Sequence, residues 1–188
     1  MFITDLEAVN GVLRELGEQP LDSLGTDYPT EDLAKVNLVT ARRELLTHGW
    51  WFNTVIKFTI KADANGRLKV PDNTLEFIPD NPTLIWSGAY LMSNTGETAL
   101  GGSHPTVQGK LKFDLEFNAL PYTVQQAVVL AAAASVYASD FGPDQKYQEI
   151  RLRLQACLTL IANQHLRSVK PSIKSTPSMQ RYYRSLSF

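Results

Sequence analysis

The chain has 188 residues, and its 18 basic and 19 acidic side chains give a formal net charge of −1 at pH 7. This length suits one ordinary domain, or one domain with an inserted lobe, and it allows a buried core without a disulfide or a metal ion. The balanced charge excludes a general electrostatic attraction to nucleic acid or to an anionic membrane.

No targeting or membrane segment is predicted. The first ten residues, MFITDLEAVN, lack the basic and apolar regions of a signal peptide. No apolar run approaches the roughly 20 residues that a membrane span needs. The single cysteine, Cys157, lies among leucines in a helical pattern and is predicted to be a reduced core thiol rather than a nucleophile. We therefore expect a soluble protein without a membrane anchor, synthesised in a cytoplasm.

Residues 5–16 are predicted to form a first amphipathic helix, because apolar residues recur there at helical spacing. Thr4 and Glu7 have the spacing of a capping box, in which each side chain accepts a hydrogen bond from the other residue's backbone N–H. Gly17 is expected to end this helix in the left-handed conformation.

A second helix is predicted to begin with Thr30 as its N-cap and to end near His48. Arg42 and Arg43 lie near its C-terminal end, where positive charge is favoured by the helix dipole. Gly49 is expected to stop the helix.

Three large aromatic residues follow directly: Trp50, Trp51 and Phe52. After them the hydrophobic period changes from about 3.6 to about 2, so one short segment joins a helical layer to a β layer. Each ring can bury roughly 150–250 Å². We expect these rings to form a core at the joint between the two layers.

The next part of the chain, residues 52–118, has β signals. Residues 53–61 alternate, and the Asn65-Gly66 pair predicts a hairpin turn after which residues 67–70 pair back on the same strand. A long strand is predicted over residues 83–92.

The last predicted strand covers residues 106–117, whose apolar and polar side chains alternate. Its polar face, which we expect to be exposed to solvent, consists of Lys110, Lys112, Asp114 and Glu116. Before it lies a polar glycine-rich loop, residues 93–105, which is long for a plain connector. Its candidate contact residues are Gly96, Gly101, Gly102 and His104.

Residues 122–141 are predicted to form a third helix, and residues 144–169 a fourth. The centre of the third helix, AVVLAAAAS, is apolar on nearly every side. Such a helix lies either deep in a bundle or between subunits.

The C-terminal segment, residues 170–188, has no acidic residue and no clear period. Such a tail is disordered alone or ordered against a partner, and we expect it to become ordered in an assembly. Its four positive charges are few for phosphate contacts, which favours a protein partner over nucleic acid. The candidate contact residues are Lys174, Arg181, Tyr182, Tyr183, Arg184 and Phe188.

The predicted fold class is α+β: an antiparallel four-helix bundle with an inserted antiparallel β lobe and an extended C-terminal tail. The first two helices occupy residues 1–51, the β lobe residues 52–118, the last two helices residues 119–169, and the tail residues 170–188.

We predict no catalytic residue, no metal site and no cofactor. The three histidines lack metal-ligand spacing, and His165 is predicted to lie at the surface. Nucleophile-elbow, Walker A and dinucleotide-binding motifs are missing. A hydrolase with paired carboxylates stays open as an alternative; its candidate acids are Glu76, Asp80, Glu97, Asp114 and Glu116.

Several short motifs together resemble one family, the tail tubular protein A family of T7-like short-tailed phages. Their order and spacing match the family pattern of A-V-N, G-E-x-P, A-R-R and R-G-W-x-F-N, although Thr47-His48 stand where the family often has a basic residue. The matching residues are Ala8-Val9-Asn10, Leu13, Leu16-Gly17-Glu18-Gln19-Pro20, Ala41-Arg42-Arg43 and Gly49-Trp50-Trp51-Phe52-Asn53.

The resemblance implies a structural virion protein without enzymatic activity, made in the bacterial host cytoplasm. Members form a head-to-tail adaptor ring, twelve-fold in the family, between the portal protein and the tail nozzle (tail tubular protein B), with tail fibres docking nearby. DNA passes through the lumen without sequence-specific binding. The C-terminal segment is then expected to contact the portal or a neighbouring copy, and the glycine-rich loop the nozzle or a fibre. The alternative function is a tail-associated cell-wall hydrolase.

Overall fold

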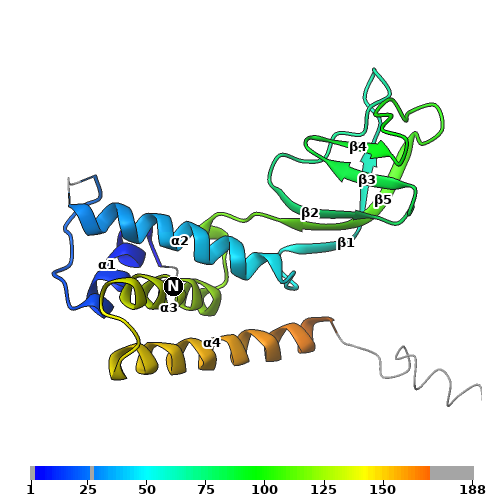
Figure 1. Ribbon diagram of the computed structural model, residues 1–188. Coiled ribbons are helices and arrows are strands. Elements are labelled where there is room, and N and C mark those ends of the chain that lie inside the picture. Colours follow the sequence, from blue (N-terminus) through cyan, green and yellow to red (C-terminus); the bar gives the residue numbers. More distant parts are fainter. Residues whose placement is uncertain (1–2, 26–27, 170–188) are drawn as a thin grey trace, which may run out of the picture.

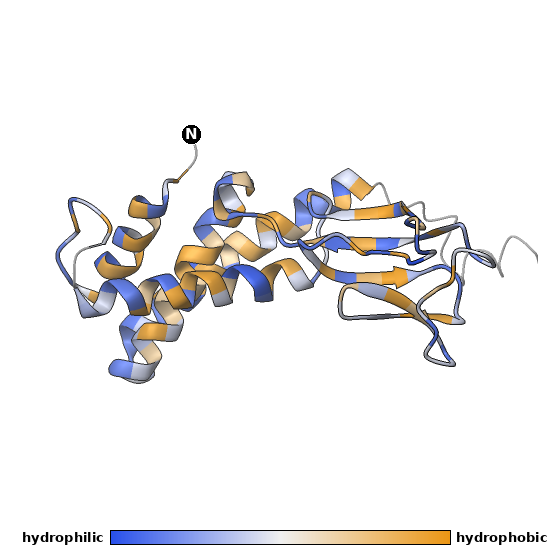
Figure 2. Ribbon diagram, turned by 90° about the horizontal axis from the view of Figure 1, so that it is seen from above, coloured by the Kyte–Doolittle hydropathy of each residue, from blue (hydrophilic) through white to orange (hydrophobic). Residues whose placement is uncertain are grey.

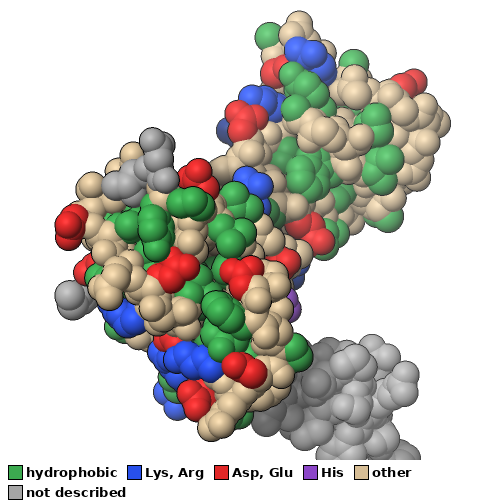
Figure 3. Space-filling view, turned by 60° about the vertical axis from the view of Figure 1, so that its left-hand side comes forward, with side chains coloured by type: hydrophobic (Ala, Val, Ile, Leu, Met, Phe, Trp, Pro, Cys, Tyr) green, Lys and Arg blue, Asp and Glu red, His purple; other side chains and the backbone are tan. Residues whose placement is uncertain are grey.

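The computed structural model describes residues 3–25 and 28–169, which form helices at one end and small antiparallel sheets at the other (Figure 1). The chain is therefore α+β, as predicted. The space-filling view shows a narrow waist between the helical part and the β part (Figure 3). The elements are α1 (Asp5–Leu16), α2 (Pro29–Thr47), β1 (Thr54–Lys61), β2 (Thr74–Pro79), β3 (Leu84–Ser87), β4 (Tyr90–Ser93), β5 (Thr106–Phe113), a 3-10 turn (Phe117–Ala119), α3 (Tyr122–Asp140) and α4 (Gln145–Val169).

Helix α1 begins and ends as its sequence predicts. The Glu7 backbone N–H donates to Thr4 Oγ1 at 3.2 Å, and the Thr4 N–H donates to Glu7 Oε2 at 2.8 Å, which completes the capping box. Gly17 follows with φ of 83°, the left-handed conformation that glycine adopts without strain.

Helix α2 begins one residue before its predicted cap, so the prediction for Thr30 is wrong. Pro29 occupies the first turn, where its missing N–H costs nothing, and Tyr28 is the N-cap residue without a side-chain hydrogen bond. The Thr30 hydroxyl donates instead to Glu18 Oε1 at 3.2 Å. This bond ties the start of α2 to the end of α1.

Helix α3 is the centre of the helical part. It packs against α1, α2 and α4, and it lies between α2 and α4 (Figure 1). Apolar residues are concentrated where the helices meet (Figure 2). Of the two alternatives for this apolar helix, burial within its own chain is the one observed. Its buried apolar residues are Val124, Ala127, Val128, Leu130, Ala132, Ala133, Ala134, Val136 and Tyr137.

Strand β5 is the middle strand of a three-stranded antiparallel sheet with the order β1-β5-β2. The predicted pairing of residues 67–70 with residues 53–61 is wrong, because β1 pairs with β5 along its length. The turn itself forms, with Gly66 at φ of 72°. However, the fully buried Leu68 and the nearly buried Val70 pack in a second core near β4. Burial of these side chains, rather than the turn, decides the partner.

The long strand predicted over residues 83–92 is also wrong, because the chain reverses at Gly88, whose φ is 61°. The two halves, β3 and β4, pair as a hairpin with Ser87 opposite Tyr90. The Trp86 indole N–H donates to the Gly88 carbonyl at 2.7 Å and holds this turn.

Candidate interaction surfaces

The three aromatic residues after α2 are half-buried against the helical core. The rings of Trp50 and His165 lie 5.7 Å apart and nearly perpendicular, and the rings of Trp51 and Phe52 lie 5.0 Å apart. The prediction of a surface position for His165 is wrong, because the end of α4 reaches this joint and its ring contacts both tryptophans. The aromatic segment therefore connects the ends of α2 and α4.

Asn53 is the most buried residue of this joint; the sequence analysis placed it in the family motif but predicted no structural role for it. Its side-chain amide donates to the carbonyls of Leu46 at 3.0 Å and Phe113 at 3.1 Å. Its Oδ1 accepts the Trp50 backbone N–H at 2.8 Å. One side chain thus satisfies backbone groups of α2, β5 and the aromatic segment. The sequence signal for this role was the position of Asn53, a polar residue between three aromatic residues and a predicted strand.

An ion-pair cluster crosses from the helical part to the segment after β5. The buried Arg42 contacts Asp114 at 3.2 Å and Glu116 at 2.9 Å, and Arg43 contacts Asp114 at 3.1 Å. These arginines therefore do not act at the C-terminal end of α2 as predicted. Because the Arg42 side chain is only 9% exposed and that of Asp114 only 17%, the contact is largely shielded from solvent.

The positive charge at the end of α2 comes from β5 instead. Lys112 Nζ donates to the Thr47 carbonyl at 2.7 Å and also pairs with Glu76 at 2.7 Å. The expected solvent exposure of the polar face of residues 106–117 is thus wrong for Lys112 and Asp114, because α2 covers them. Lys110 and Glu116 on the same face are exposed.

The acids considered for hydrolysis do not gather in a cleft. Glu76, Asp114 and Glu116 are held by the cations just described. Neither of the two grooves described for this chain is lined by any of the five candidate acids. Within residues 3–25 and 28–169, no group of three or more His, Cys, Asp or Glu side chains is placed to hold a metal ion. None of the helices in these ranges is long and apolar enough to cross a membrane.

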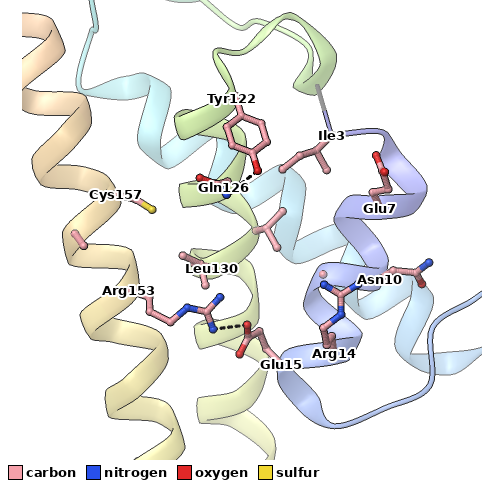
Figure 4. Close-up of a pocket in the computed structure, with 13 residues that line it drawn as sticks. Ile3, Glu7, Asn10, Arg14, Glu15, Tyr122, Gln126, Leu130, Arg153 and Cys157 are labelled. Atoms are coloured by element: carbon pink, nitrogen blue, oxygen red, sulfur yellow. Dashed lines mark hydrogen bonds and ion pairs between the residues drawn. The ribbon is translucent and has the colours of Figure 1, made fainter. Parts of the chain in front are cut away.

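The larger groove, of about 580 Å³, lies between α1, α3 and α4 (Figure 4). At one end Glu15 contacts Arg153 at 2.5 Å and Lys146 at 3.1 Å, which ties α1 to α4. Burial raises the pKa of Glu15, but hydrogen bonds from both cations lower it overall. Burial raises the pKa of the Cys157 thiol on the groove wall. A raised pKa disfavours the reactive thiolate, which agrees with the predicted inert thiol.

The glycine-rich loop has a fixed base and an exposed remainder. Leu100 is buried in the second core, and the Gly101 N–H donates to the Gly66 carbonyl at 2.7 Å. The half-buried His104 follows this base, and its backbone N–H donates to the Leu100 carbonyl. Gly96, at φ of 88°, and Gly102 are exposed. The predicted contact residues of the C-terminal segment lie outside the described residues.

The fold has two dissimilar ends, a helical part and a β part, joined by aromatic packing and ion pairs. Residues 6–171 match the family model of the tail tubular proteins. The chain therefore belongs to the tail tubular protein family, as the sequence motifs indicated, and is a structural protein of a phage tail, found in the virion.

A curated relative is tail tubular protein A of Klebsiella phage KP34. It is 29% identical over 185 residues, which cover 96% of this chain and 97% of the relative. The similarity thus extends over nearly the whole length of both chains.

Proposed function

We propose that twelve copies of this chain form a head-to-tail adaptor ring that joins the portal protein to the tail nozzle. The ring lies at the head-tail junction, and DNA passes through its lumen without sequence-specific binding. The main observation behind this proposal is that the chain, a tail tubular protein, has a helical end and a β end that buried contacts hold together. A connector needs such a body, because each of its ends meets a different partner.

In this proposal the four helices form an antiparallel bundle, and the β lobe is an insertion between its second and third helices. The connectivity supports this arrangement, because α2 leads directly into β1 and the chain returns from β5 to α3. The insertion leaves the packing of α3 on α1, α2 and α4 intact.

The contact surfaces follow from the chemistry of the two ends. The exposed part of the loop around Gly96 and Gly102 contacts the nozzle or a tail fibre, because it projects from the end of the β part away from the helices (Figure 1). The C-terminal segment contacts the portal or a neighbouring copy. Its aromatic and basic side chains suit a protein surface.

The function is tested with particles of a phage that lacks the gene for this chain, grown in a host that does not supply it. We expect DNA-filled heads with portals but without attached nozzles, and we expect added purified chain to restore tails and infectivity. Particles that attach complete tails without the chain would contradict the proposal. Release of soluble fragments from purified cell wall by the chain alone would point to a hydrolase instead.

A further inference from the structure

Helix α2 has an apolar row on the side that faces away from the core. Leu33, Val36 and Val39 recur at a spacing of three residues, and Val36 is 64% exposed. The opposite side of the same helix is buried, with Ala34 and Leu38 in the core. Both sides of α2 thus carry apolar residues, and Val39 at the edge of the outer row also lines the smaller groove with Asp5 and Leu24.

Helix α4 also carries exposed leucines on the side away from the core, spaced eight and six residues apart; we call them the α4 row. Leu152, Leu160 and Leu166 are 71%, 55% and 56% exposed, whereas Ile150 and Ile161 on the other side are fully buried. Single exposed leucines are common in soluble proteins. Exposed apolar side chains that recur on the outer sides of two helices of one chain suggest an interaction surface.

The two rows point in opposite directions, because α3 lies between α2 and α4 (Figure 1). Within residues 3–25 and 28–169, the side chains of both rows remain 39% to 71% exposed. A single chain therefore presents two different apolar faces on opposite sides, which is the arrangement that a head-to-tail interface needs. Pairing either face with itself would leave the other face exposed.

We propose that the outer face of α2 on one copy packs against the outer face of α4 on the next copy around the ring. This inference rests on the proposed ring and names its subunit contact. Charges beside the rows support the pairing. Glu44 flanks the α2 row together with Asp32, which lies 3.9 Å from Lys35, whereas Arg151 and Arg167, with one acid, Glu149, flank the α4 row. The nearby cations of α2, Lys35 and Arg43, already pair within the chain.

The size of this contact indicates a weak pairwise interaction. The 19 residues of α2 span about 28 Å, and a helix width of about 10 Å gives a footprint of about 300 Å² per partner. Stable interfaces bury about 800 Å² per partner. Many copies held side by side on one portal therefore stabilise a contact that two free copies form only at high concentration.

The test uses two full-length variants, Val36→Asp and Leu160→Asp, each of which damages one face. Ile56→Asp is the matched control, because Ile56 on β1 is 66% exposed and lies outside both rows. Sedimentation measures association of each variant, alone at high concentration and with portal rings, and thermal melting checks that the fold is kept. We expect each face variant to associate about tenfold more weakly or worse, and the control to behave as the unmodified chain.

Mixing the two face variants gives the decisive result. Each still has one intact face, so we expect the mixture to form particles of twice the 21.0 kDa chain mass and nothing larger. A mixture that stays monomeric, or face variants that assemble like the control, would overturn this interface while leaving the ring itself in place. Assembly lost only on removal of residues 170–188 would overturn it too, and would identify that segment as the contact. An unmodified chain that never forms multi-copy particles would overturn the ring and this interface together.

Discussion

Arg42 and Arg43 are adjacent on α2, but their surroundings differ. The Arg42 side chain is buried between Asp114 and Glu116, whereas the Arg43 side chain is 60% exposed and contacts Asp114 from the solvent side. A buried charge that loses its partner is costly, whereas an exposed pair contributes little. Substituting Arg42 should therefore reduce stability more than the same substitution at Arg43.

Replacing Arg42 by methionine should lower the free energy of unfolding by about 2–3 kcal/mol, because the mostly buried Asp114 keeps only its exposed partner. Arg43→Met is the matched control and should cause little measurable loss. Urea denaturation of both variants measures the difference. If both variants lost the same free energy of unfolding, the burial of Arg42 would not be what determines its contribution to stability.

Asn53→Ala should cost about 2–3 kcal/mol of folding stability, because it leaves carbonyls of Leu46 and Phe113 without their donor in a buried place. The control is Asn94→Ala, at an exposed position of the glycine-rich loop. Thermal melting compares the two. If Asn53→Ala barely changed the melting temperature, water would have replaced the amide as the donor to these carbonyls.

At the scale of elements, α4 packs along α3 and is also tied to other parts of the chain at two places. Its last turns contact the aromatic segment through His165, and its first half is tied to α1 through Glu15. The second attachment depends on pH. The pKa of Glu15 lies below its ordinary value of 4.5, so its contribution is complete above pH 4.5 and is lost as the pH falls through the lowered pKa.

Glu15→Gln should therefore reduce the melting temperature at neutral pH and have less effect well below pH 4.5, where the carboxylate of the unmodified chain is protonated. Melting curves at both pH values, with the exposed Glu149→Gln as control, isolate this group from other acids. If Glu15→Gln were equally destabilising at both pH values, the ion pairs would not be the cause.

Some elements were predictable from local pattern alone. The bounds of α1 follow from Thr4, Glu7 and Gly17, because caps are local signals. The partner of β1 was not predictable in this way, because Asn65-Gly66 marks a reversal of the chain but not the strand that receives it. Burial of Leu68 decides that, and burial is a property of the whole fold.

The candidate surfaces were also only partly predictable from local sequence pattern. The aromatic segment was visible as three rings in a row, whereas Lys112 and Asp114 read as exposed in an alternating strand. Only the position of α2 over that face buries them. Polar side chains in a joint cannot be recognised before the elements on both sides of it are placed.

At the scale of the whole molecule, we expect deletion of residues 175–188 to leave the melting temperature unchanged and to weaken portal docking. The segment follows the last helix and has no core pattern of its own. Neutralising Lys174, Arg181 and Arg184 to glutamine in one variant, and replacing Tyr182 and Tyr183 by alanine in another, separates charge from aromatic contact. A truncated chain that binds portal rings normally would contradict this role.

The central claim is that this tail protein is a connector that assembles as a ring on the portal. Light scattering of the purified chain, alone and then mixed with portal rings, measures this directly. We predict a particle of 21.0 kDa alone at low concentration and a complex with multiple copies, twelve per ring, after mixing. A chain that remains monomeric in the presence of the portal would contradict the account.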